Sequence, residues 1–186
     1  MSASKLFSRM QIPSVVLPAA LAFSAASLGA QDAASSPIPS PRDATRATVS
    51  GATLLVDYGR PSKRGWAICG GLVPWGQVWR TGANAATTFV TSKPLVIGGT
   101  TVPAGTYTLY SVPNQSGPWL LVVNKQTKQW GTEYHQDQDL ARIPMTTASV
   151  SPAVEKFTIE VAPQGSGGVI GLVWDTTRAS VAFRVQ

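Results

Sequence analysis

The stretch LVIGGTTVPAGTYTLYSV, residues 95–112, decides the fold that we predict for this chain. Two short runs of β-branched and apolar residues lie on either side of Gly98 and Gly99, a combination that is typical of a β-hairpin. The Pro-Ala-Gly sequence at 103–105 then turns the chain into a third run, in which threonine alternates with tyrosine or leucine. Alternation with a period of two indicates a strand with one buried face. The stretch therefore predicts three successive strands joined by tight turns.

Runs of the same kind continue on both sides of this stretch. Further strands are expected at 54–58, 87–91, 119–123, 157–161, 169–174 and 180–185. Residues 119–123 are continuously apolar, which indicates a strand buried on both faces. The last two runs are expected to pair across a turn at 175–177. Helix is nearly absent, because the best helical segment, Gln136–Ile143, has room for only about two turns.

This strand pattern determines the expected fold class. About nine short strands, separated by glycine, proline, asparagine and aspartate, predict an all-β domain. We expect a single antiparallel β-sandwich, or a partly open barrel, over residues 47–186. With 186 residues in all, the chain has the length of one domain preceded by an N-terminal extension.

The N-terminal extension is typical of an exported protein. Lys5 and Arg9 precede an uncharged run of apolar and small residues, which is the pattern of a secretory signal peptide. This run is shorter than the roughly 20 apolar residues that a membrane-spanning helix needs. Small residues favour cleavage near Ala30, so residues 1–30 are the expected signal peptide. Residues 31–46 are rich in proline and serine and predict a flexible linker, so we expect a periplasmic or extracellular domain without a membrane span.

Composition argues against several classes of partner. The chain has 15 Lys and Arg against 9 Asp and Glu, a formal net charge of +6. These basic residues form no stripe and belong to no recognised nucleic-acid-binding module, so no nucleic acid is expected as a partner. A single cysteine and a single histidine argue against an internal disulfide and against zinc sites with several Cys or His ligands.

The segment WGTEYHQDQDLAR, residues 130–142, is the best alternative for a metal site. Asp137 and Asp139, with His135 nearby, could supply oxygen and nitrogen ligands to a divalent ion. The segment lacks the glycine and the distal glutamate of a calcium-binding helix–loop–helix motif. We therefore interpret it as an exposed acidic turn and expect neither a metal nor a cofactor.

The least strand-like segment, residues 60–89, is the strongest candidate for a contact surface, since a long irregular segment is often functional. Trp75 and Trp79 are four residues apart, so an extended chain points both indoles to one side, as a platform for a sugar or an aromatic ligand. The alternative is that the two indoles cap the core. The guanidinium of Arg80 adds N–H donors that could bind a small anion through two hydrogen bonds. The candidate ligand-binding residues are Trp75, Trp79, Arg80, Thr81, Asn84, Trp130, Tyr134 and His135.

Three blocks of this sequence resemble one family closely. They are GGLVPWGQVWRTGAN at 70–84, PAGTYTLYSVP at 103–113 and WLLVVNKQTKQWG at 119–131. In order and spacing they are similar to an exported bacterial family catalogued as domain of unknown function 2911, over about residues 41–185. The resemblance implies a secreted, β-rich domain with no established activity.

The chain departs from the pattern of that family at two positions. Members typically carry an acid where this chain has Ala85, and an aromatic residue where it has Cys69. Without that acid, Arg80 is expected to pair elsewhere, and Asp57, Glu133 and Asp137 are the candidates.

Two classes of function remain. The first is a non-enzymatic binding module that uses residues 60–89 to contact a glycan, a small anionic ligand or an envelope protein. The second is a glycan-directed hydrolase of the envelope, with His135 or a carboxylate pair such as Glu133 and Glu155 as acid and base. The single imidazole and the lack of a nucleophile motif favour binding. Cys69 is expected to be a buried small apolar residue beside Ile68 and Leu72 rather than a nucleophile.

Export of the chain is directly testable. Expressed in a bacterium with its own leader, the protein should accumulate outside the cytoplasm with residues 1–30 removed. N-terminal sequencing of the secreted or periplasmic fraction should therefore begin near Gln31. An intact Met1 in that fraction would contradict the signal-peptide interpretation.

Overall fold

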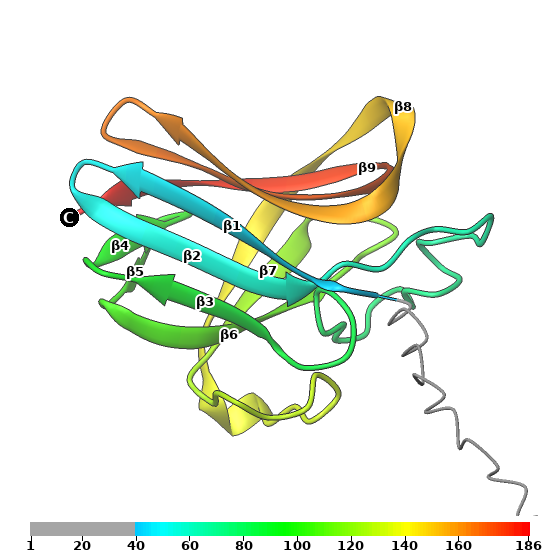
Figure 1. Cartoon of the computed structure of the whole chain (residues 1–186), viewed down its shortest axis with the longest axis horizontal. Coiled ribbons are helices and arrows are strands. Elements are labelled where there is room, and N and C mark those ends of the chain that lie inside the picture. Colours follow the sequence, from blue (N-terminus) through cyan, green and yellow to red (C-terminus); the bar gives the residue numbers. More distant parts are fainter. Residues whose placement is uncertain (1–39) are drawn as a thin grey trace, which may run out of the picture. The chain divides into compact units, whose positions relative to one another are not determined.

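The computed structural model describes residues 40–186, which form an all-β domain (Figure 1). Its strands are β1 (Arg42–Val49), β2 (Ala52–Gly59), β3 (Thr87–Thr91), β4 (Leu95–Ile97), β5 (Thr100–Val102), β6 (Gly105–Val112), β7 (Trp119–Asn124), β8 (Asp139–Gln164) and β9 (Gly167–Val185). They form one antiparallel sheet in the order β1-β2-β3-β6-β7-β8-β9-β4-β5, which is not closed. The predicted all-β antiparallel class is confirmed. The predicted signal peptide and most of the predicted linker lie outside the described residues.

The long strand β8 connects the two halves of the sheet. Its first part pairs with β7, where Met145 lies opposite Trp119, and its later part pairs with β9, where Ala162 lies opposite Val169. In Figure 1, β9 and the later part of β8 lie above β1 in the view, and β2 lies below it. The two layers expected of a sandwich are therefore two halves of one sheet, and the apolar core contains residues from both.

Hairpin turns account for the local order of the strands. Gly98 and Gly99 have φ values of 53° and 90°, the left-handed conformations that a two-residue hairpin loop needs, and they join β4 to β5 as predicted. Ser50 and Gly51, with φ values of 48° and 73°, make the same kind of connection between β1 and β2.

The prediction that order begins near Ala47 is wrong. Residues 42–46 belong to β1, which pairs with β2 from Arg42 opposite Gly59 to Val49 opposite Ala52. Its small and polar residues suggested a linker, but they are typical of an edge strand with one exposed side.

The prediction of two C-terminal strands joined at 175–177 is also wrong. Residues 167–185 form one strand, β9, in which Asp175 adopts a φ of 53°. The ladder with β8 is irregular at the same level, with register shifts on both sides of Val154. The two strands therefore bend together at this point instead of reversing. Of the helical segment expected at 136–143, only Gln136–Gln138 forms a single 3-10 turn, because β8 begins at Asp139.

Side chains from β1, from β2 and from the residue that follows β2 close the gap between the two halves of the sheet. The hydroxyl of Tyr58, a residue only 1% exposed, accepts a hydrogen bond from the N–H of Ile159 at 3.1 Å. Thr45 donates its hydroxyl to the carbonyl of Ile159 at 2.6 Å. Arg60 donates its Nε–H to the carbonyl of Phe157 at 3.1 Å. These contacts give hydrogen-bond partners to backbone groups of Phe157 and Ile159 on the edge of β8 that faces away from β9.

The Tyr58 hydroxyl is expected to contribute measurably to stability. Tyr58→Phe removes the acceptor of a buried N–H, and such an unsatisfied group costs about 1–3 kcal/mol. Urea denaturation should show this decrease in the free energy of unfolding. Tyr107→Phe is the matched control, because the Tyr107 hydroxyl donates to Pro103 in a loop that water can reach. An equal and small effect of both substitutions would contradict the role given to Tyr58.

Candidate functional site

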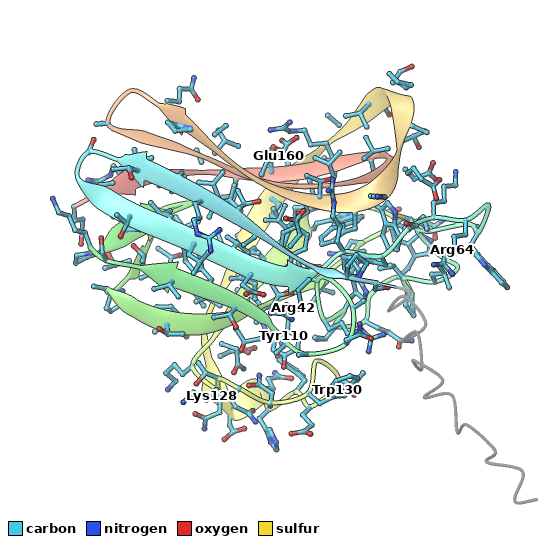
Figure 2. All side chains as sticks on the ribbon, viewed as in Figure 1. Arg42, Arg64, Tyr110, Lys128, Trp130 and Glu160 are labelled. Carbon is cyan, nitrogen blue, oxygen red and sulfur yellow. The ribbon has the colours of Figure 1, made fainter. Side chains whose placement is uncertain are left out.

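A hollow lined by three of the eight predicted site residues lies over β6, between segments 72–80 and 131–134. We call it the Arg80 pocket. It has a volume of about 240 Å³. Its lining residues are Leu72, Val78, Trp79, Arg80, Tyr110, Gly131, Thr132 and Tyr134. Figure 2 shows Tyr110 and the neighbouring Trp130 on the same side of the domain.

Pairing with the end of β6 positions Trp79 and Arg80. The N–H of Trp79 donates to the carbonyl of Ser111 at 2.7 Å, and the N–H of Ser111 donates back at 2.9 Å. The Trp79 indole stacks on Trp174 with ring centroids 5.9 Å apart and meets Phe157 edge-on at 4.9 Å. Of the two predicted roles for Trp79, the structure therefore shows packing against the core.

Gly131 lets the second segment approach the stem of Arg80. A Cβ atom at position 131 would lie 2.9 Å from the Arg80 Cδ and 2.5 Å from the carbonyl oxygen of Asn84. Only glycine therefore fits at this position without a shift of backbone. The close approach brings Thr132 and Tyr134 to the same hollow as Arg80.

Arg80 is the one charged residue among those that line the pocket. The expectation that it pairs with Asp57, Glu133 or Asp137 is wrong. Asp57 pairs with Arg42, and within residues 40–186 no ion pair or hydrogen bond engages the Arg80 side chain. Its guanidinium therefore keeps its hydrogen-bonding capacity for water or for a ligand.

Tyr110 and Tyr134 form a rigid wall of the pocket. Their rings meet edge-on with centroids 4.9 Å apart. Tyr110 donates its hydroxyl to the carbonyl of Glu133 at 2.6 Å and accepts a hydrogen bond from Gln129 at 3.0 Å. Burial raises the pKa of the Tyr110 phenol above its ordinary value, so the phenol stays protonated at neutral pH.

The second tyrosine, Tyr134, is fixed by a polar network. It donates its hydroxyl to Asp139 at 2.6 Å, and Arg142 donates both to that hydroxyl and to the same carboxylate. Burial, together with the hydrogen bond to Asp139, raises the pKa of Tyr134 to about 12. Asn124 donates to the other oxygen of Asp139 and to the carbonyl of His135. The wall of the pocket is therefore preformed. None of Asn124, Gln129 and Arg142 carried a signal in the sequence, since their role depends on partners from separate segments.

The remaining predicted site residues lie elsewhere. Trp75 packs edge-on against Trp119, with ring centroids 6.4 Å apart, and lines a different hollow. Thr81 is fully buried, and its hydroxyl donates to that of Ser111. Asn84 donates to the carbonyl of Ser40.

Trp130 and His135 are surface residues near the pocket. Trp130 is 51% exposed, and its backbone forms an isolated bridge with Ala85. His135 is exposed, and within the described part of the chain no hydrogen bond joins its imidazole to a carboxylate or a hydroxyl. The structure thus brings together Trp79, Arg80 and Tyr134, while His135 lies outside their pocket.

Cys69 lines a small apolar hollow beside Trp79, Phe157 and Trp174. Burial raises the pKa of its thiol, and the nearby Asp175 raises it further, against a hydrogen bond from Thr177 that lowers it. Cys69 is only half-buried and Leu72 is 49% exposed, so of the strip that was expected to be buried only Ile68 is. Leu72 instead lines the Arg80 pocket.

Residues 40–186 contain neither a metal-binding cluster nor a membrane-spanning helix. No group of three or more His, Cys, Asp and Glu side chains there could hold a metal ion. No helix in this range has the length and apolar character needed to cross a membrane.

The described domain is thus an open, nine-stranded β-sheet domain with a preformed pocket beside one arginine. A family model described as "Protein of unknown function (DUF2911)" matches residues 40–183, and the chain belongs to this family. The family predicted from the three sequence blocks is confirmed. Comparisons with curated proteins and with solved structures found no match.

The environment of Cys69 predicts low thiol reactivity. Only the thiolate attacks an electrophile, and the raised pKa keeps the thiol protonated at neutral pH. An uncharged maleimide should therefore label the folded protein more slowly than the urea-unfolded protein, and labelling should accelerate as the pH rises above neutrality. Equal labelling rates of the two states at neutral pH would contradict the raised pKa, and faster labelling of the folded protein would show that Cys69 is an activated thiol.

Proposed function

We propose that this domain is a non-enzymatic binding module that captures a small organic anion in the Arg80 pocket. The observation that supports the proposal most strongly is the unneutralised charge of Arg80. Arg80 is the one charged residue lining the hollow, and within residues 40–186 no acid neutralises it. A guanidinium whose donors are unused is well suited to bind a carboxylate or a phosphate through two parallel hydrogen bonds.

The other walls of the pocket suggest which anions fit. Leu72 and Val78 supply apolar surface, the two tyrosines supply ring edges and faces, and Thr132 supplies a hydroxyl. The volume of about 240 Å³ lies below the roughly 300–1,000 Å³ of pockets that hold drug-sized ligands. A small acid with an apolar or aromatic body is therefore the best match.

Preorganisation supports binding over catalysis. The hydrogen bonds of Tyr110 and Tyr134 fix the pocket wall before any ligand arrives, which lowers the ordering cost of association. Both phenols have raised pKa values and are poor proton acceptors at neutral pH. His135 has no carboxylate to orient it in the described residues, and no carboxylate lines the pocket. These features give the hydrolase alternative no specific support.

Export belongs to the same proposal. The basic and apolar pattern of residues 1–30 favours secretion. The protein would then bind its ligand outside the cytoplasm.

Titration calorimetry with benzoate, succinate and inorganic phosphate tests the proposal. Benzamide is the neutral counterpart of benzoate. Benzoate should bind and benzamide should not, because only the former carries a charge for Arg80. Arg80→Gln should weaken benzoate binding at least about tenfold, the effect of losing a charge-assisted pair, and added salt should weaken binding to the parent protein.

Arg184→Gln is the matched control, since Arg184 is an exposed arginine on β9 outside the Arg80 pocket. It should leave the affinity for benzoate unchanged. Failure of all three anions to bind the parent protein, or an equal loss in both arginine variants, would refute anion capture at Arg80.

A further inference from the structure

A second hollow, which we call the Trp75 hollow, lies where the inner face of the sheet opens to solvent. It has a volume of about 230 Å³. Its lining residues are Trp75, Asn114, Gln115, Trp119, Thr147, Ala148, Ser149 and Thr177. Neither an acidic nor a basic side chain lines it, in contrast to the Arg80 pocket.

The polar wall of this hollow follows from the register of β8. The ladder with β7 ends at Met145, which lies opposite Trp119. Successive side chains of a strand alternate between its two faces, so Thr147 and Ser149 continue the inward face on which Met145 is buried. On β9, Thr177 lies directly opposite Ser149. The inner face thus changes from apolar to hydroxyl-bearing at the point where β7 no longer covers it.

The aromatic wall comes from the opposite side. The N–H of Gly76 donates to the carbonyl of Pro113 at 2.7 Å, which holds Trp75 beside the turn at 113–118. Trp75 is half-buried, and it meets the almost fully buried Trp119 edge-on at an interplanar angle of 78°. An indole in this position is rigid and partly open to the hollow.

The polar groups of the hollow are largely unused. Within residues 40–186 no hydrogen bond engages the hydroxyl of Thr147 or Ser149, or the amide of Gln115. Asn114 donates its amide to the carbonyl of Pro118 at 2.6 Å, which fixes the side chain. Hydroxyl and amide groups both donate and accept hydrogen bonds, so this rim suits a ligand that does both.

We infer that the Trp75 hollow binds the ring of a neutral sugar. A pyranose has apolar C–H groups that pack on an indole face and hydroxyls that pair with short neutral side chains. A charged ligand would find no counter-charge here, and the limited volume fits one ring or the end of a chain rather than a larger ligand. This site is separate from the Arg80 pocket and does not depend on the function proposed for it.

Calorimetry with four neutral trisaccharides tests the inference: maltotriose, cellotriose, xylotriose and triacetylchitotriose, each at millimolar concentration. At least one should bind saturably and change the tryptophan fluorescence. Trp75→Ala should weaken that binding about tenfold or more. Trp66→Ala is the matched control, because Trp66 is 64% exposed and lies outside the hollow, and it should leave the affinity unchanged.

A second variant protects the test against a folding defect in Trp75→Ala. The double substitution Thr147→Ala, Ser149→Ala changes only exposed hydroxyls, so the thermal melt should remain that of the parent protein while trisaccharide binding weakens. Because the probes are neutral, their binding should not change with salt, unlike capture of an anion by Arg80. The inference is overturned if no trisaccharide binds, or if binding is the same in the parent protein and in both hollow variants.

Discussion

The free edge of β8 at residues 157–159 is the constraint on which the rest of the structure depends. On one side this part of β8 pairs with β9, while on the other side the backbone of the described domain provides only an isolated bridge between Ser62 and Lys156 and a hydrogen bond from the N–H of Phe157 to the carbonyl of Pro61. Its buried N–H and carbonyl groups still need partners, since an unpaired group in the interior costs free energy comparable to a lost hydrogen bond. Tyr58, Thr45 and Arg60 supply those partners from β1, β2 and the following loop. The two halves of an open sheet are thereby held together without closing into a barrel.

The same edge determines where the candidate site can form. The ring of Phe157 contacts Tyr58, Trp79 and Trp174, with centroid distances between 4.9 and 5.8 Å. Trp79 is therefore held in the core, and its backbone is held by Ser111 at the end of β6. Arg80, the next residue, is consequently placed at the surface hollow by contacts that belong to the core. An irregular segment of this length is positioned rigidly because the indoles of Trp75 and Trp79 are part of the packing.

The two hollows of the domain differ in charge, and this difference separates their proposed ligands. The Arg80 pocket has one cation among apolar and aromatic walls. The Trp75 hollow has hydroxyls, amides and indoles but no charged side chain. The Arg80 pocket lies between β6 and two loop segments, whereas the Trp75 hollow lies between the turn after β6, the start of β7 and the facing parts of β8 and β9. Neighbouring residues of one tryptophan-rich segment thus contribute to two sites of different chemistry.

By itself, the sequence determined the all-β class, the β4–β5 hairpin, the family, and Arg80 as a candidate ligand-binding residue. These features depend on local periodicity, on glycine at turn positions, and on blocks of adjacent residues. Only the tertiary structure decided that residues 42–46 form a strand, that β9 is continuous through Asp175, and that Trp75 and Trp79 serve different hollows. It also decided that Arg80 has no acidic partner in the described domain. Each of these outcomes depends on which residues from separate segments of the chain lie together in the folded domain, and local sequence patterns do not encode those contacts.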